Sequence, residues 1–114
     1  MKLYLFLSLV FFSLPSIAGG WSHWASPTQV DMERGNGIMV YGAFGNPSAC
    51  GLKDRFYLPK THPDYDKIYG VILAAFTAQK ELRVYSHNCG KVGWYATETD
   101  AFNFIGDGAV NIRH

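Results

Sequence analysis

The stretch THPDYDKIYGVILAAFTAQKE, residues 61–81, replaces the strand-like pattern around it with a helical one. Its large apolar side chains recur at the spacing of one helical face, at Tyr65, Ile68, Tyr69, Ile72 and Phe76. Thr61 or His62 suits the cap, and Pro63 suits the first turn. The stretch therefore predicts one helix over residues 63–79.

Shorter segments on both sides of this helix are rich in β-branched and aromatic residues, which is typical of strands. The expected strands are residues 25–32, 37–44, 53–59, 81–87, 91–97, 101–106 and 109–113. Asn36-Gly37 is a strong hairpin signal, and Asn88-Cys89-Gly90 is expected to turn the chain between 81–87 and 91–97. The last two segments are expected to pair with each other.

The order of these elements predicts a mainly β fold with one helix, of the α+β class. Three strands, a helix and then a hairpin is the order of the OB-fold, a five-stranded barrel with its helix between strands three and four. An α+β roll, with the helix lying across an antiparallel sheet, is the alternative. Periodicity alone does not separate the two.

The first 18 residues, MKLYLFLSLVFFSLPSIA, have the form of a secretory signal peptide. A lysine precedes an apolar run, and small residues follow at the expected cleavage site. The alternative is a retained anchor, but the run is shorter than the roughly 20 apolar residues of a membrane span. We expect residues 19–114 to form a single domain that is secreted or periplasmic, without membrane insertion.

The chain has two cysteines, Cys50 and Cys89, and in an exported domain such a pair predicts a disulfide. The alternatives are a cysteine nucleophile with His87 as its base, or a metal ligand. An exported thiol with a ready partner should not stay reduced, and the four histidines are scattered. We therefore expect no metal site and no cofactor.

The charge balance argues against nucleic acid as a partner. The chain has 10 Lys and Arg against 9 Asp and Glu, and Lys2 leaves with the signal peptide, so the mature charges balance. A nucleic-acid-binding domain would normally carry a basic stripe. The acidic residues show no pair at a spacing typical of catalysis, and we expect no enzymatic activity.

Aromatic residues are abundant for so small a domain, and some of them lie near turns or near the mature end. The candidates for ligand binding are Trp21, Trp24, Tyr41 and Tyr85, whose rings can stack on sugar rings. The alternative for each is a place in the core, and we expect that place for Trp94, which lies inside an apolar hairpin.

A second surface is predicted on the helix. Gly70, Ala74 and Ala78 recur at i, i+4 and i+8, opposite the large apolar face. A helix that is apolar on most sides needs cover on two of them. We expect self-association through this row of small residues; the alternative is a helix sunk into an unusually wrapped core.

The middle of the chain resembles a known family. The segment ACGLKDRFYLP (49–59), the aromatic-rich helix and the segment LRVYSHNCGKVGW (82–94) follow in an order similar to that in the B subunits of subtilase cytotoxin and typhoid toxin. The resemblance covers about residues 37–95. It implies an exported OB-fold domain, a ring of five copies, and binding to host-cell glycans that often end in sialic acid.

The resemblance also implies a separate catalytic A subunit on another chain. In the B subunits a serine before the second strand contacts the sialic acid, and here Asn36 or Gly37 occupies the matching position. The cysteine after the helix also falls elsewhere. We therefore add Asn36 to the ligand-binding candidates. Because the serine is replaced, the resemblance implies the fold better than it implies sialic acid as the ligand.

The function expected from the sequence is that of an exported, non-enzymatic recognition module that binds glycans. A small periplasmic or secreted domain that binds or inhibits another protein is the alternative. Net charge and aromatic content fit both functions, so the sequence does not choose between them.

Overall fold

The computed structural model describes residues 19–32, 37–95 and 101–114. The elements are β1 (Gly20–Trp21), β2 (Gln29–Met32), β3 (Gly37–Tyr41), β4 (Arg55–Pro59), α1 (Tyr65–Ala78), β5 (Glu81–Ser86), β6 (Asn88–Gly90), β7 (Phe102–Phe104) and β8 (Val110–Arg113). The prediction of a mainly β fold with one helix is confirmed. The signal peptide and Asn36 lie outside the described residues.

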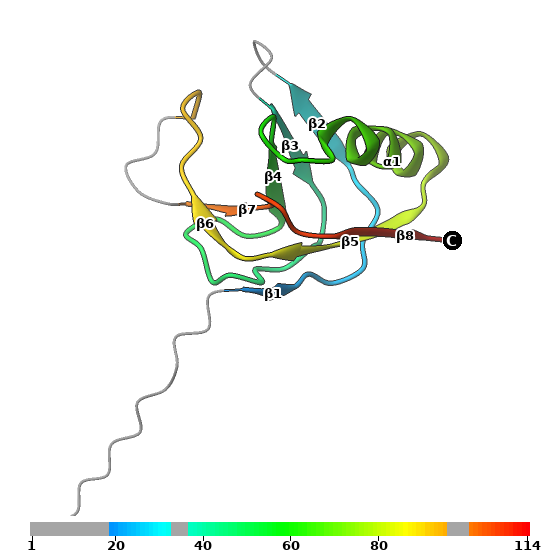
Figure 1. Cartoon of the computed structure of the whole chain (residues 1–114). Helices are drawn as coiled ribbons and strands as arrows, with labels where there is room; N and C mark the ends of the chain where they lie inside the picture. Colours follow the sequence, from blue (N-terminus) through cyan, green and yellow to red (C-terminus); the bar gives the residue numbers. More distant parts are fainter. Residues whose placement is uncertain (1–18, 33–36, 96–100) are drawn as a thin grey trace, which may run out of the picture.

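The strands form two sheets (Figure 1). One has three strands in the order β1-β5-β8, and the other has five in the order β2-β3-β4-β7-β6. All the pairings are antiparallel except that of β4 with β7, which is parallel. The expected closed barrel is not seen in the described residues, because the strands that follow α1 divide between the two sheets.

Helix α1 confirms the helical period of the central stretch to within two residues at its start and one at its end. Ile68, Ile72 and Ala75 are buried, as expected for one face. Phe76 was expected on that face but keeps 37% of its surface exposed. The last buried residue of this helix is Ala75, and Phe76 lies beside the buried face.

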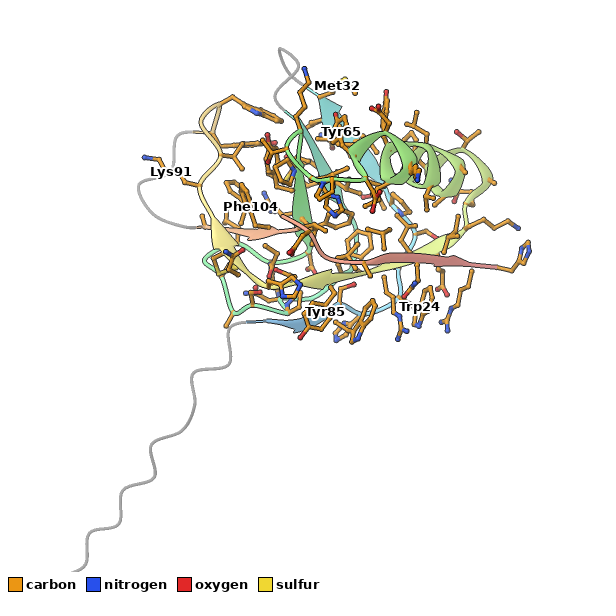
Figure 2. The ribbon with its side chains drawn as sticks, in the orientation of Figure 1. Trp24, Met32, Tyr65, Tyr85, Lys91 and Phe104 are labelled. Carbon is orange, nitrogen blue, oxygen red and sulfur yellow. A yellow bond between two sulfur atoms is a disulfide. The ribbon has the colours of Figure 1, made fainter. Side chains whose placement is uncertain are left out.

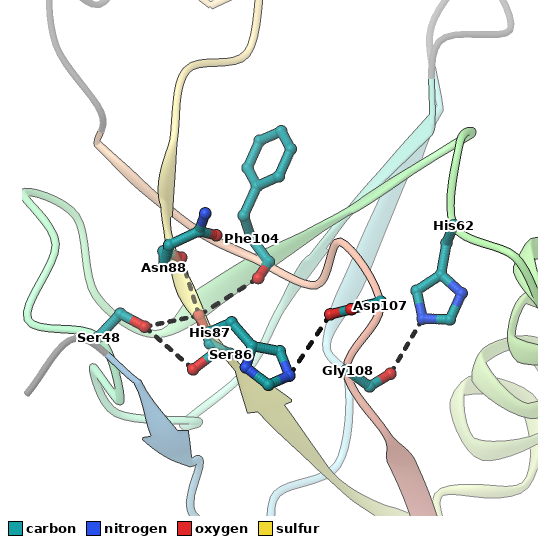
Figure 3. Close-up of polar contacts among 8 residues, drawn as sticks. All are labelled: Ser48, His62, Ser86, His87, Asn88, Phe104, Asp107 and Gly108. Carbon is teal, nitrogen blue, oxygen red and sulfur yellow. Dashed lines mark hydrogen bonds and ion pairs between the residues drawn. The ribbon is translucent and has the colours of Figure 1, made fainter.

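The start of α1 is fastened by His62, which is buried. Its Nδ1 accepts a hydrogen bond from the Asp64 N–H at 2.9 Å. Its Nε2 therefore carries the proton and donates to the Gly108 carbonyl at 3.0 Å. One imidazole thus satisfies a backbone donor of the first turn and ties the helix to the loop between β7 and β8 (Figure 3).

Apolar side chains fill both faces of the larger sheet. Along β3 and β4 successive residues point to opposite faces. Ile38 and Leu58 join α1 and β5 in the main core, whereas Met39 and Tyr57 join Val92 in a second cluster. Burial on both faces explains why β3 and β4 are almost continuously apolar instead of alternating with polar residues.

The predicted hairpin at Asn88-Cys89-Gly90 is wrong. Chain direction does not reverse there; β5 passes through His87 into β6, which pairs with β7. A Cβ at Gly90 would overlap the ring of Phe104, so this glycine serves a close approach between strands and not a turn. In the described part of residues 91–97, no strand is formed, and Val92 and Trp94 instead cover the second cluster.

The last two strands also pair differently from the prediction. Both β7 and β8 form where strands were expected, but they do not pair with each other. β7 lies between β4 and β6, and β8 lies beside β5. The loop between them, which His62 binds at Gly108, separates the two strands, and each joins a different sheet.

The disulfide prediction is confirmed. Cys50 and Cys89 are joined with an S–S distance of 2.08 Å. The bond ties the loop before β4 to β6, and Asn46 holds the same loop through two hydrogen bonds of 2.8 Å to the backbone of Cys50. Within the described residues, no helix is long and apolar enough to cross a membrane.

Candidate functional site

Strand β5 presents a polar and aromatic face to the outside of the smaller sheet. Its residues alternate, with Leu82 and Val84 buried and with Arg83 and Tyr85 half-buried on the outer side. β1 and β8 flank it, so side chains from three separate segments of the chain meet on this face. Among the described residues, helix α1 packs on the opposite face of β5, so it leaves this face accessible to a ligand (Figure 1).

Five side chains form a continuous row on this face, which we call the Trp–Arg row: Tyr85, Trp21, Arg83, Trp24 and Arg113. Tyr85 meets Trp21 edge-on, with ring centroids 5.3 Å apart. The Arg83 guanidinium lies 4.1 Å from the ring centre of Trp21 and 5.0 Å from that of Trp24. The Arg113 guanidinium lies 4.1 Å from the ring centre of Trp24. Each guanidinium over a ring is attracted by its π face, which holds the row in one arrangement.

Backbone hydrogen bonds fix the segment that carries both tryptophans against β5. The Ser22 N–H donates to the Val84 carbonyl at 2.8 Å. The Val84 N–H donates to the Ser22 hydroxyl at 2.9 Å. Ala25 and Leu82 exchange backbone bonds of 2.9 and 2.8 Å. The tryptophans therefore stand on a rigid strand edge, and Figure 2 shows Trp24 and Tyr85 at the same border of the molecule, beside β5 and β8.

The two arginines of the row differ in their charge partners. Arg113 donates to the Glu81 carboxylate at 2.8 Å. Arg83 donates through Nε to the Asn111 side-chain oxygen at 3.1 Å. Among the described residues, no carboxylate lies within ion-pair distance of Arg83. The row therefore carries an oriented positive charge at its centre that has no carboxylate partner in the described part of the chain.

Exposure differs along the row. Trp21 keeps 42% of its surface exposed, whereas Trp24 and Tyr85 are half-buried. An exposed ring that is held in place loses little conformational entropy when a ligand packs on it. Trp21 is thus the ring most available to a ligand, and its neighbours orient it.

The structure brings together three of the predicted ligand-binding residues, Trp21, Trp24 and Tyr85, and separates them from Tyr41. Asn36 lies outside the described residues. Arg83 and Arg113 were missed by the sequence reasoning. The signal for Arg83 was present in the alternation of residues 81–87, which places Arg83 and Tyr85 on one face, but Arg113 joins them only through the pairing of β8 with β5.

Tyr41 belongs to a different group on the larger sheet. Its hydroxyl is hydrogen-bonded to that of Tyr95, which donates to the Asp31 carboxylate at 3.1 Å. The Arg55 guanidinium lies 5.0 Å from the Tyr41 ring centre. These contacts fasten the 91–95 segment over the second cluster. Trp94, expected in the core, is half-buried there, with its indole nitrogen fully covered.

The hydrogen bonds of Tyr95 predict how the stability of the protein changes at alkaline pH. Burial, together with the bonds to Tyr41 and Asp31, raises the pKa of Tyr95 far above its ordinary value. The folded protein therefore keeps this proton where an unfolded chain, with tyrosines that titrate near pH 10, has lost it. The contribution to stability is complete below about pH 10 and is lost as the pH rises above it.

Replacing Tyr95 by phenylalanine should weaken this alkaline loss of stability. Urea unfolding at a series of pH values from neutral upward measures the slope for both proteins. Some slope should remain, because burial also raises the pKa values of Tyr57 and Tyr65. Equal slopes in the two proteins would show that Tyr95 does not carry the effect.

The side chains nearest to a catalytic arrangement are His87 and Asp107, whose Nε2 and Oδ1 atoms lie 3.4 Å apart. Ser86 precedes His87 in the chain, but its hydroxyl is buried and is hydrogen-bonded to the Ser48 hydroxyl at 2.7 Å (Figure 3). Both cysteines are consumed by the disulfide. In the part of the chain that the structure describes, no three His, Cys, Asp or Glu residues gather as metal ligands.

Two shallow hollows lie around the first turn of α1, away from the Trp–Arg row. His62, Asp64 and Lys67 line both. Both ring nitrogens of His62 are already bonded to the backbone, at Asp64 and Gly108, so this imidazole serves the fold. We therefore take the Trp–Arg row as the candidate functional site.

Comparisons of the chain with models of known protein families, with curated proteins and with solved structures find no match.

Proposed function

We propose that residues 19–114 form an exported, non-enzymatic recognition domain that binds carbohydrate through the Trp–Arg row. The observation that carries the proposal is an exposed Trp21, stacked with Arg83 on the outer face of the smaller sheet. Sugar C–H groups pack on the negative face of an aromatic ring, and guanidinium and amide groups bind hydroxyls. Arg83 and Asn111 supply such groups beside the rings.

Export is part of the same proposal. The first 18 residues have the form of a signal peptide, and the disulfide fits an oxidising compartment. The toxin B-subunit resemblance is proposed on similar terms. It is supported by the order of the segments 49–59, α1 and 82–94 along the chain, with α1 between strands β4 and β5.

A glycan array probed with the mature protein tests the function. We expect binding to a defined subset of glycans and none to single-stranded oligonucleotides, because the mature chain carries no net basic charge. A blank array would overturn the proposal. Trp, Tyr and Arg are also the residues that dominate protein–protein contacts, so capture of a protein ligand by the same face would then establish the alternative.

Self-association through α1 remains a proposal, together with the ring of five copies and the separate catalytic subunit. Gly70, Ala74 and Ala78 are exposed, and a Cβ at Gly70 would meet nothing within 4 Å. Leu73 and Phe76 each expose 37% of their surface on the same helix. An exposed surface that combines small and apolar residues allows close approach of a second copy.

Replacing Ala74 by lysine should therefore break the assembly. Lys is strongly hydrated, and burying it in a contact between copies without a partner is costly. Light scattering at micromolar concentration measures the mass of both proteins, and Thr61→Lys is the matched control because it adds the same charge at another exposed site. A monomeric wild-type protein would exclude self-association.

A further inference from the structure

We infer that the Trp–Arg row binds its ligand lengthwise, as a linear oligosaccharide whose inner units carry an acidic group, and not as one terminal sugar. The inference rests on the proposed function. The length of the row, its place on an outer sheet face and the order of its charges support this mode of binding.

The row is long compared with one sugar ring. From Glu81 to His87, β5 and its continuation span seven residues, which is about 20 Å at the rise of a strand. Tyr85 continues the row towards His87, with ring centroids 4.8 Å apart, and His87 contacts Asp107. The ion pair of Arg113 with Glu81 forms the opposite end of the row. Contact groups therefore extend over several sugar units.

The row also lies on the outer face of the smaller sheet, opposite the face on which Leu82 and Val84 join α1 in the core. Sites that hold a small ligand tightly surround it and bury most of its surface. The two hollows around the start of α1 do not include any residue of the row. A single sugar on an open sheet face would bury one side only, and its affinity would be low. Affinity on such a face must come from successive contacts along a chain.

The charges are ordered along the row. At one end the Glu81 carboxylate is paired with Arg113, and at the other end the Asp107 carboxylate lies 3.4 Å from His87 Nε2. The centre carries Arg83, whose charge has no carboxylate partner among the described residues. Its Nε–H is held by Asn111, which leaves the terminal nitrogens of the guanidinium to bind an anion. An acidic substituent on an inner unit would meet this group.

The first experiment varies ligand length and charge. Titration calorimetry on the mature protein would use galacturonan, hyaluronan and heparin fragments, from disaccharide to octasaccharide, with neutral cello-oligosaccharides of the same lengths. We expect affinity for at least one acidic series to rise by about ten-fold or more from the shortest to the longest fragment, as successive contacts are added. Equal affinity at all lengths, or no preference for any acidic series, would overturn the inference.

The second experiment removes contacts from either side of Arg83. Trp24→Ala and Tyr85→Ala should each weaken binding of the octasaccharide by about ten-fold or more. At most one of them should affect a disaccharide, because a short ligand cannot reach both. Equal effects of both variants on a disaccharide would show a single compact site and contradict the inference.

A third comparison isolates the charge. Arg83→Met keeps an apolar side chain of similar length and should remove the preference for acidic over neutral fragments, whereas Arg83→Lys should retain part of it. An unchanged preference in the methionine variant would contradict the assignment to Arg83. If glycans bind through a terminal sugar without length dependence, only this inference fails; if no glycan binds at all, the proposed function fails with it.

Discussion

Replacing both Cys50 and Cys89 by alanine is expected to lower the free energy of unfolding by about 4 kcal/mol, through the loss of a cross-link that closes a loop of 39 residues. The bond limits the conformations open to the unfolded chain, and its effect grows slowly with loop length. A loss of this size is a large part of the stability of a small domain. The variant should therefore be partly unfolded near body temperature.

Urea unfolding followed by tryptophan fluorescence measures this loss. The wild-type protein in the presence of a reductant provides an independent comparison, because it breaks the same bond without changing the sequence. The two should agree within the error of the extrapolation. A double variant as stable as the wild type would mean that the hydrogen bonds of Asn46 and the pairing of β6 with β7 hold this region without the disulfide.

Replacing Trp21 by alanine is expected to weaken glycan binding by about thirty-fold or more, the effect of a residue that dominates an interface. The reason is that Trp21 is the most exposed ring of the Trp–Arg row and stands between Tyr85 and Arg83. Its removal also releases Arg83 from one of its two rings, so the guanidinium loses part of its orientation.

The matched control is Met32→Ala, which removes another exposed, large apolar side chain, on β2 and outside both the row and α1. It should leave glycan affinity unchanged. Melting temperatures of both variants show whether a loss of binding comes with a loss of fold, and Trp21→Ala should melt within a few degrees of the wild type. Full binding by Trp21→Ala would remove the Trp–Arg row as the binding site.

Several features could be predicted from the sequence because their cause is local or because few alternatives exist. The period of residues 61–81 determined α1, since its large apolar side chains recur at helical spacing and this spacing is a local property of the sequence. The apolar composition of β3 and β4 determined two strands of the sheet. The disulfide followed because two cysteines in an exported chain leave one possible pair.

Other features were decided only by the tertiary structure. Asn88-Cys89-Gly90 has the composition of a turn, yet it forms β6, because pairing with β7, the disulfide and the close approach of Phe104 outweigh the local preference. Pairing between strands distant in sequence depends on backbone hydrogen bonds, which carry no residue-specific signal. For this reason the sequence predicted most of the strands but not the two sheets that they form.

The candidate site divides in the same way. The sequence pointed to Trp21, Trp24 and Tyr85 as individual aromatic residues, and the alternation along β5 placed Arg83 beside Tyr85. The tertiary structure alone joined them into a row, since β1, β5 and β8 come from the two ends and the middle of the chain. Cation–π contacts such as those of Arg113 with Trp24 act over a few ångströms in space and leave no periodic trace in the sequence.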